Sequence, residues 1–140
     1  MSTRATAFTR LNKGWNAEPN APDPQVSIVD GELVLTFSPN PFQFKGFFED
    51  QRVRVVFTRA WRYRMGTVND EGWYRGQCRF SRVAPAWGEF YEIHGDLLLD
   101  VCPDDWQELR RKPNEDMRHF LFHFRDEEFE CDAVNWRFEK

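Results

Sequence analysis

Alternation of apolar and polar residues is clearest over residues 26–37, VSIVDGELVLTF. The middle of this stretch is Asp30-Gly31, a preferred pair for the two-residue turn that joins antiparallel strands. With that turn, Ile28 lies opposite Leu33, and the apolar residues of both strands share one face. The pattern therefore predicts a β-hairpin with one face in a core.

A second alternation runs through residues 52–65, where Val53, Val55 and Phe57 share one side and arginines occupy much of the other. The alternation fails near Arg59. An irregularity of this kind is typical of a β-bulge, so we expect one long strand or two strands joined by a bulge.

The C-terminal residues 118–139 predict another hairpin, because phenylalanines recur at every second position. A turn at residues 126–127 places Phe124 opposite Phe129. Beyond Ala133 the apolar residues change to the other parity, which indicates a further bulge.

Shorter patterns complete the fold prediction. Residues 73–81, 87–93 and 95–102 read as strands, and Phe42 with Phe44 indicates a short strand before Gly46. The absence of strand–helix–strand spacing favours a mainly β fold, namely a single-domain antiparallel sandwich or barrel-like roll of about eight strands.

One short helix is expected near residues 104–111. Asp105 and Glu108 resemble a capping box, Trp106 and Leu109 share a helical face, and Pro113 would end the helix. Residues 1–25, by contrast, mix Asn, Gly and Pro with little periodicity, and predict an irregular arm anchored by Trp15 on a β-rich domain at 26–140.

Composition adds that the core is built from rings, since the 140 residues include 14 Phe and 6 Trp. The three cysteines form no C-x-x-C motif, and their odd number does not suit a disulfide framework. Neither a signal peptide nor a membrane span is recognisable, so we expect a cytoplasmic protein with reduced thiols.

The net charge of −4 hides a basic block at residues 52–82, which carries eight arginines. These arginines mostly alternate with apolar residues and should form an outward stripe, which raises the possibility of a nucleic-acid surface. The overall acidity disfavours that interpretation, and the acid-rich residues 126–132 can neutralise the stripe.

The most informative polar residue is Glu89, which shares a strand face with Trp87 and Tyr91. Three roles are open to an acid on an aromatic face. Glu89 can pair with an arginine of a neighbouring strand, orient a polar ligand in a ring-lined pocket, or act as an acid with a raised pKa if a second titrating group is close.

The stretch MGTVNDEGWYRG, residues 65–76, reads as a chain reversal, because Asn, Asp and Gly favour turns. Its rim would present Trp73, Tyr74 and Arg75, which are residue types favoured at interface hot spots. We therefore expect any partner to meet these three side chains.

Metal and nucleophile chemistry find little support. His119 and His123 on one strand would lie about 13 Å apart, too far to share an ion. Cys78 and Cys131 fall among inward phenylalanines, where a thiol behaves as a small hydrophobe. We expect no catalytic residue, no metal site and no cofactor.

Three functions follow from these features. The leading hypothesis is a small cytoplasmic non-catalytic interaction domain, whose protein partner is a second copy of the chain or a toxin-like target. The alternative is a barrel-like binder of a small organic ligand in an aromatic-lined pocket containing Glu89. The third is an enzyme that uses Glu89 or Asp70 as acid or base.

Overall fold

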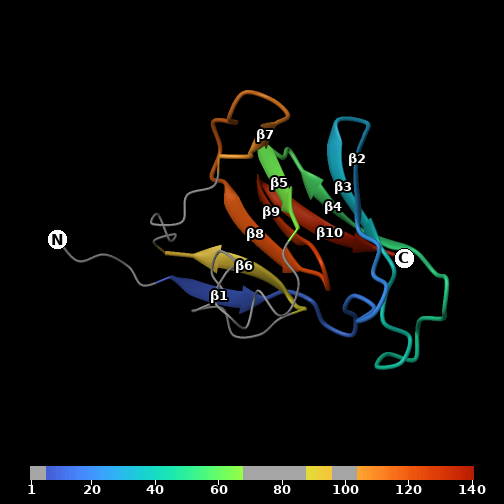
Figure 1. Ribbon diagram of the computed structural model, residues 1–140. Helices are drawn as coiled ribbons and strands as arrows, with labels where there is room; N and C mark the ends of the chain where they lie inside the picture. The colour runs from blue at the N-terminus through green and yellow to red at the C-terminus, as the bar shows by residue number, and fades with distance from the viewer. Residues whose placement is uncertain (1–5, 68–87, 96–103) are drawn as a thin grey trace.

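The computed structural model describes residues 6–67, 88–95 and 104–140, which form two antiparallel sheets stacked as an open sandwich (Figure 1). The six-stranded sheet has the order β1-β6-β8-β9-β5-β7, and the four-stranded sheet has the order β10-β4-β3-β2. The predicted mainly β, antiparallel class is confirmed, with ten strands in the described residues instead of about eight. The strands are β1 (Ala7–Arg10), β2 (Gln25–Val29), β3 (Glu32–Phe37), β4 (Val53–Thr58), β5 (Arg62–Gly66), β6 (Phe90–His94), β7 (Gln107–Glu108), β8 (Arg118–His123), β9 (Glu128–Ala133) and β10 (Asn135–Glu139).

The predicted β2–β3 hairpin is present in the predicted register, with Ile28 opposite Leu33. Asp30 and Gly31 both adopt positive φ, 52° and 80°, as a two-residue turn of the primed type requires. Leu33 is fully buried, but Ile28 is 51% exposed, because β2 forms the edge of its sheet.

The two breaks in alternation mark the places where the chain passes from one sheet to the other. Arg59, with φ of 52°, lies between β4 and β5, and Val134 lies between β9 and β10. Two backbone hydrogen bonds hold the crossings together, from Val134 N to Thr58 O at 3.0 Å and from Trp61 N to Asp132 O at 2.8 Å. A paired ribbon therefore bends across both layers where the sequence suggested bulges.

The register predicted for β8 and β9 is wrong by two residues. Phe122, not Phe124, lies opposite Phe129, and Phe124 N donates to Glu127 O at 2.8 Å to close a longer turn. Because side chains alternate with a period of two, a slip of two residues keeps every phenylalanine on the predicted face.

The predicted helix at 104–111 is wrong. Gln107 and Glu108 form the short strand β7 against β5, with Glu108 opposite Arg62. The carboxylate of Asp105 accepts a hydrogen bond from Arg64 Nε at 2.7 Å instead of capping a helix. No helix of the described chain is long and apolar enough to cross a membrane.

The N-terminal arm is not irregular throughout, because it contributes β1, which pairs with β6 and places Phe8 opposite Ile93. Trp15 is buried and stacks on Phe138 with ring centroids 4.3 Å apart. The expectation that Trp15 anchors the arm is confirmed.

Aromatic rings fill the space between the sheets. Phe57 of the four-stranded sheet lies 5.4 Å from Phe120 and 5.5 Å from Phe129 of the six-stranded sheet, centroid to centroid. Each fully buried ring contributes about 1.5–3 kcal/mol of hydrophobic stabilisation. The predicted ring-rich core is therefore present, and its rings pack directly against one another.

Candidate functional site

Glu89 lies immediately before β6 at one end of the sandwich, where Asn12 binds it. The buried Asn12 side chain donates from Nδ2 to Glu89 and to Trp15 O, and its Oδ1 accepts from Phe90 N at 3.1 Å. Among the described residues the partner of Glu89 is thus a neutral amide, and no arginine of that part of the chain pairs with it. Within the described residues the Glu89 carboxylate has no counter-ion.

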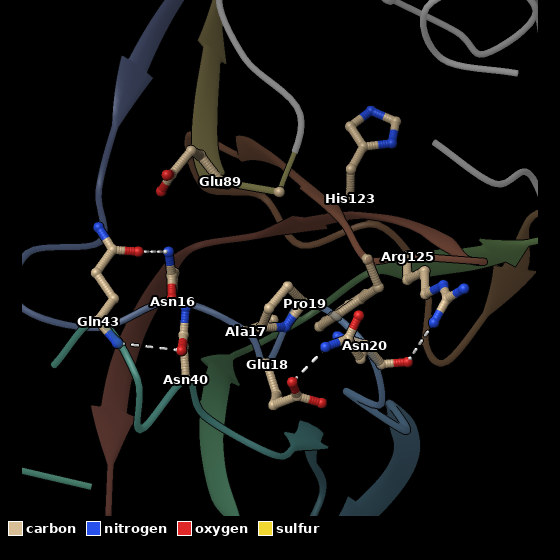
Figure 2. A pocket seen from close by; sticks show the side chains of 12 residues that line it. Asn16, Ala17, Glu18, Pro19, Asn20, Asn40, Gln43, Glu89, His123 and Arg125 are labelled. Carbon is tan, nitrogen blue, oxygen red and sulfur yellow. Dashed lines mark hydrogen bonds between the residues drawn. The ribbon is translucent and has the colours of Figure 1, made fainter. Parts of the chain in front are cut away.

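Beside Glu89 lies an open groove of about 450 Å³. Figure 2 shows Glu89 and His123 on one side of it and Glu18 with Asn20 on the other. Amide and charged side chains dominate its lining, with Phe124 as the aromatic member among the described residues. The groove, called here the Glu89 groove, is lined by Asn16, Ala17, Glu18, Pro19, Asn20, Asn40, Gln43, Gly88, Glu89, His123, Phe124 and Arg125.

The charges around the Glu89 groove are fixed by local hydrogen bonds. The Glu18 carboxylate accepts hydrogen bonds from the backbone N–H groups of Asn20 and Ala21. Arg125 Nη1 donates to Asn20 O at 3.0 Å. Burial lowers the pKa of His123 to about 3, with the nearby Arg64 charge acting in the same direction, so His123 is neutral.

The other predicted site residues lie elsewhere. Tyr91 is buried on the face of the six-stranded sheet that points away from the core, in an edge-to-face contact with Phe8 at 5.9 Å. It does not line the Glu89 groove. Residues outside the described part of the chain include the remaining candidates Asp70, Trp73, Tyr74, Arg75 and Trp87.

A second hollow, of about 260 Å³, adjoins the groove and was not anticipated from the sequence. It is named here the Phe42 hollow, after the ring on its rim, which is 70% exposed. Phe48, nearby in the chain, is 69% exposed. The Phe42 hollow is lined by Glu18, Asn20, Ala21, Ser38, Pro39, Pro41, Phe42, Glu49 and Asp50.

The loop that carries these rings, residues 38–51, is irregular where a short strand at Phe42 was expected. Asn40 Oδ1 accepts from the backbone N–H groups of Phe42 and Gln43, at 3.0 and 3.3 Å. A reciprocal pair of 3.2 Å hydrogen bonds joins Gln51 to Phe48.

Between the two exposed rings of this loop, Phe47 turns inward, is buried, and meets Phe138 edge to face. The loop is therefore tied to the body by hydrogen bonds and one ring while two rings point to solvent. The run of non-alternating Phe and Pro residues in SPNPFQFKGFF was the only sequence signal for this surface.

A different cluster of charges is buried on the outer face of the six-stranded sheet. His119 bridges two carboxylates, with Nδ1 2.7 Å from Asp132 Oδ1 and Nε2 2.9 Å from Glu130 Oε1. Arg62 Nε donates to Asp132 at 2.7 Å, and Arg64 Nη1 donates to Glu130 at 3.0 Å. We name this set, together with Glu128 and the exposed Asp105 at its edge, the buried ion network.

The buried ion network holds His119 and Arg64 in their charged forms. Burial alone would lower the pKa of His119, but the hydrogen bonds and charges of Asp132 and Glu130 outweigh it and raise that pKa to about 8. Arg64 also loses solvent, yet its contacts with Asp105 and Glu128 raise its pKa. Such mutual compensation is what a buried charge requires.

The contacts of this network bear on two predictions, the solvated arginine stripe and the placement of the two histidines. The arginine stripe is not solvated at Arg62 and Arg64, and the proposed neutralisation by the acid-rich residues 126–132 is confirmed for these two side chains. His119 and His123 lie on a strand, as predicted; His119 contacts Asp132 and Glu130, whereas His123 Nδ1 lies 4.0 Å from Glu128. Among the described side chains, no group of three or more His, Cys, Asp or Glu could hold a metal ion.

Cys131, the free cysteine within the described ranges, is buried among the core rings, and burial raises the pKa of its thiol. A thiol that resists ionisation is a poor nucleophile.

Comparison with known proteins identifies no relative. The chain matches no protein-family model, no curated protein and no solved structure.

Proposed function

We propose that the chain is a non-catalytic interaction domain that binds a protein partner through loop 38–51. The observation that carries the proposal is the exposure of Phe42 and Phe48 on a loop that is otherwise tied down. Leaving a ring in water forgoes about 1.5–3 kcal/mol of burial free energy. Phe47 of the same loop is buried, so the geometry of the loop does not by itself prevent burial.

A preorganised surface of this kind suits binding. Ordering a loop on association costs free energy, and hydrogen bonds from Asn40 and Gln51 have already ordered loop 38–51 in the free domain. Aromatic side chains that enter a partner's pocket commonly supply a large share of the affinity. Phe42 and Phe48 are placed to act as such anchors.

The proposal keeps the domain non-catalytic because the hydrogen-bonded acid–base grouping found among the described residues lines neither hollow. His119, Glu130 and Asp132 are buried and bound to one another on the sheet face. We also propose that the protein resides in the cytoplasm, where the Cys131 thiol would stay reduced.

A second candidate function is binding of a small polar ligand in the Glu89 groove. The groove volume lies within the range of small-molecule sites, and Glu89 offers a carboxylate without a counter-ion in the described chain. The open, polar lining is less apolar than a typical ligand pocket, which places this function second.

A random dodecapeptide library displayed on phage and selected on the intact domain tests the leading proposal. Selected peptides are expected to bind the F42A/F48A double variant at least tenfold more weakly, since a hot-spot ring contributes roughly 2 kcal/mol or more. The matched control is I28A, an exposed apolar residue near the opposite end of β3, which should leave the affinity unchanged. Peptides that bind the double variant as well as the parent would contradict the proposal.

A further inference from the structure

The Glu89 groove and the Phe42 hollow adjoin, since Glu18 and Asn20 line both. One extended segment can therefore cross from one to the other. We infer that the partner presents a basic segment, with a lysine or arginine side chain in the Glu89 groove and a neighbouring apolar side chain on Phe42. This inference rests on the proposed function and names the chemistry of the partner.

Charge complementarity is the first support. Among the described residues, the linings of the two hollows contain four carboxylates and one guanidinium, that of Arg125, which already donates to Asn20 O. No cationic residue lines the Phe42 hollow within the described chain. The four carboxylates are Glu18, Glu49, Asp50 and Glu89.

Two of these acids take no part in charge balance within the described part of the chain. Glu49 and Asp50 are exposed, and neither forms an ion pair with any described residue. Asp50 also adopts a φ of 66°, a conformation that Asn tolerates as well as Asp, so its charge is not required by the backbone. Both charges are available to an incoming cation.

The second support is a hydrogen-bond acceptor in the groove lining that has no donor among the described residues. Asn16, which lines the Glu89 groove, donates a hydrogen bond from Nδ2 to Gln43 Oε1 at 2.9 Å. Its Oδ1 is buried and accepts no hydrogen bond from the described residues. An unsatisfied buried acceptor costs free energy, and an ammonium or guanidinium group, which only donates, would relieve that cost once the Asn16 side chain turns its Oδ1 into the groove.

The same features select against other occupants. A nucleic acid would bring its phosphates to a face with excess carboxylate, which is unfavourable. An entirely apolar segment would bury Phe42, but it would leave Glu89 without a counter-ion and Asn16 Oδ1 without a donor among the described residues.

Peptides from the library selection, measured by titration calorimetry, test the inference. We expect them to be enriched in Lys or Arg beside an aromatic or aliphatic residue. The variants E49Q, D50N and E89Q should each weaken binding about two- to fivefold, in the range of partly exposed ion pairs. Binding should also weaken between about 50 and 300 mM salt, because screening shortens the reach of charge.

The matched control is E32Q, which removes an acid paired with Arg137 on the four-stranded sheet and should not change the affinity. The inference is overturned if the selected peptides show no basic enrichment and bind E49Q, D50N and E89Q as tightly as the parent. If those peptides still need Phe42, the proposed function stays intact. Failure of F42A/F48A to weaken any peptide overturns both. A third outcome is that arginine amide alone binds in a Glu89-dependent way while no peptide depends on Phe42. That outcome also overturns both the inference and the proposed function, and it favours a small-ligand site.

Discussion

Two groups of carboxylates in this molecule differ in whether a cationic side chain pairs with them. In the buried ion network, each of Glu128, Glu130 and Asp132 has an arginine or imidazolium within hydrogen-bonding distance. Around the two hollows, Glu49, Asp50 and Glu89 have no described counter-ion. The difference follows from burial, since a charge away from water must be compensated within the protein, whereas the exposed Glu49 and Asp50 are compensated by solvent. The half-buried Glu89 also accepts a hydrogen bond from Asn12.

The comparison separates stability from binding. Substitutions in the buried ion network should reduce the free energy of unfolding, whereas substitutions around the hollows should reduce affinity and leave stability nearly unchanged. The predictions below test that separation, from the largest expected effect to the smallest.

The largest loss of stability is expected from E130A. Glu130 is fully buried between His119 and Arg64, so its removal leaves two cations with one fewer compensating charge. Breaking a buried pair in this way costs about 3–5 kcal/mol. Urea denaturation followed by circular dichroism measures the change, with E49Q as the exposed control. A loss below about 1 kcal/mol would remove the contrast between the two groups.

A smaller effect is expected from pH through His119. Its pKa is about 8 when folded and 6.5 in a free side chain, so the folded state holds the proton more tightly. The resulting stabilisation, roughly 2 kcal/mol, is fully present below pH 6.5 and is lost as pH rises to about 8. Denaturation midpoints of wild type and H119Q across pH 6 to 9 check this. Equal slopes for both proteins would contradict the assigned role.

His123 should act in the opposite direction on the same strand. Its folded pKa of about 3 means that only the unfolded chain takes up a proton as pH falls below 6.5. Stability should therefore decrease towards acid because of His123, and H123Q should reduce that decrease. The quantity to compare is the difference in free energy of unfolding between wild type and H123Q, measured at pH 6.5 and at pH 4.5. An unchanged difference would show that His123 is not held neutral.

The smallest stability change is expected from R137A on the outer face of the four-stranded sheet. Arg137 pairs with Glu139 at 2.7 Å and Glu32 at 3.1 Å, but half of its side chain is exposed. Exposed pairs contribute little to stability, because water competes for both charges. The same urea titration applies, and a loss as large as that of E130A would show that ion pairing outweighs burial in this protein.

The sequence predicted the fold well where a local feature determines geometry. Asp30-Gly31 determined a turn and with it a register, whereas residues 126–127 carry no turn preference strong enough to prevent a slip of two. The helix at 104–111 failed because capping and spacing are local signals, and pairing of Glu108 with Arg62 depends on a distant strand. Breaks in alternation located both sheet crossings. The sequence alone suggested bulges there, because the existence of a second sheet was not visible in the pattern.

The candidate site was predictable only in part. Glu89 stood out as an acid among rings, but Glu18 and Asn20, which line the same groove, come from a distant segment. Asp50, which lines the adjoining Phe42 hollow, comes from another. Alternation also predicts that the polar face of β8 and β9 is solvated, and Glu130 is fully buried there. Nothing in a single strand distinguishes a buried charge from an exposed one.

The most direct test of the central claim is an amide chemical-shift titration of the isotope-labelled domain with a selected basic peptide. The account predicts that the largest shifts cluster at residues 18–21, 38–51 and 88–89, with none of comparable size at residues 128–132. Shifts centred on β9 and the buried ion network, with loop 38–51 unaffected, would contradict it.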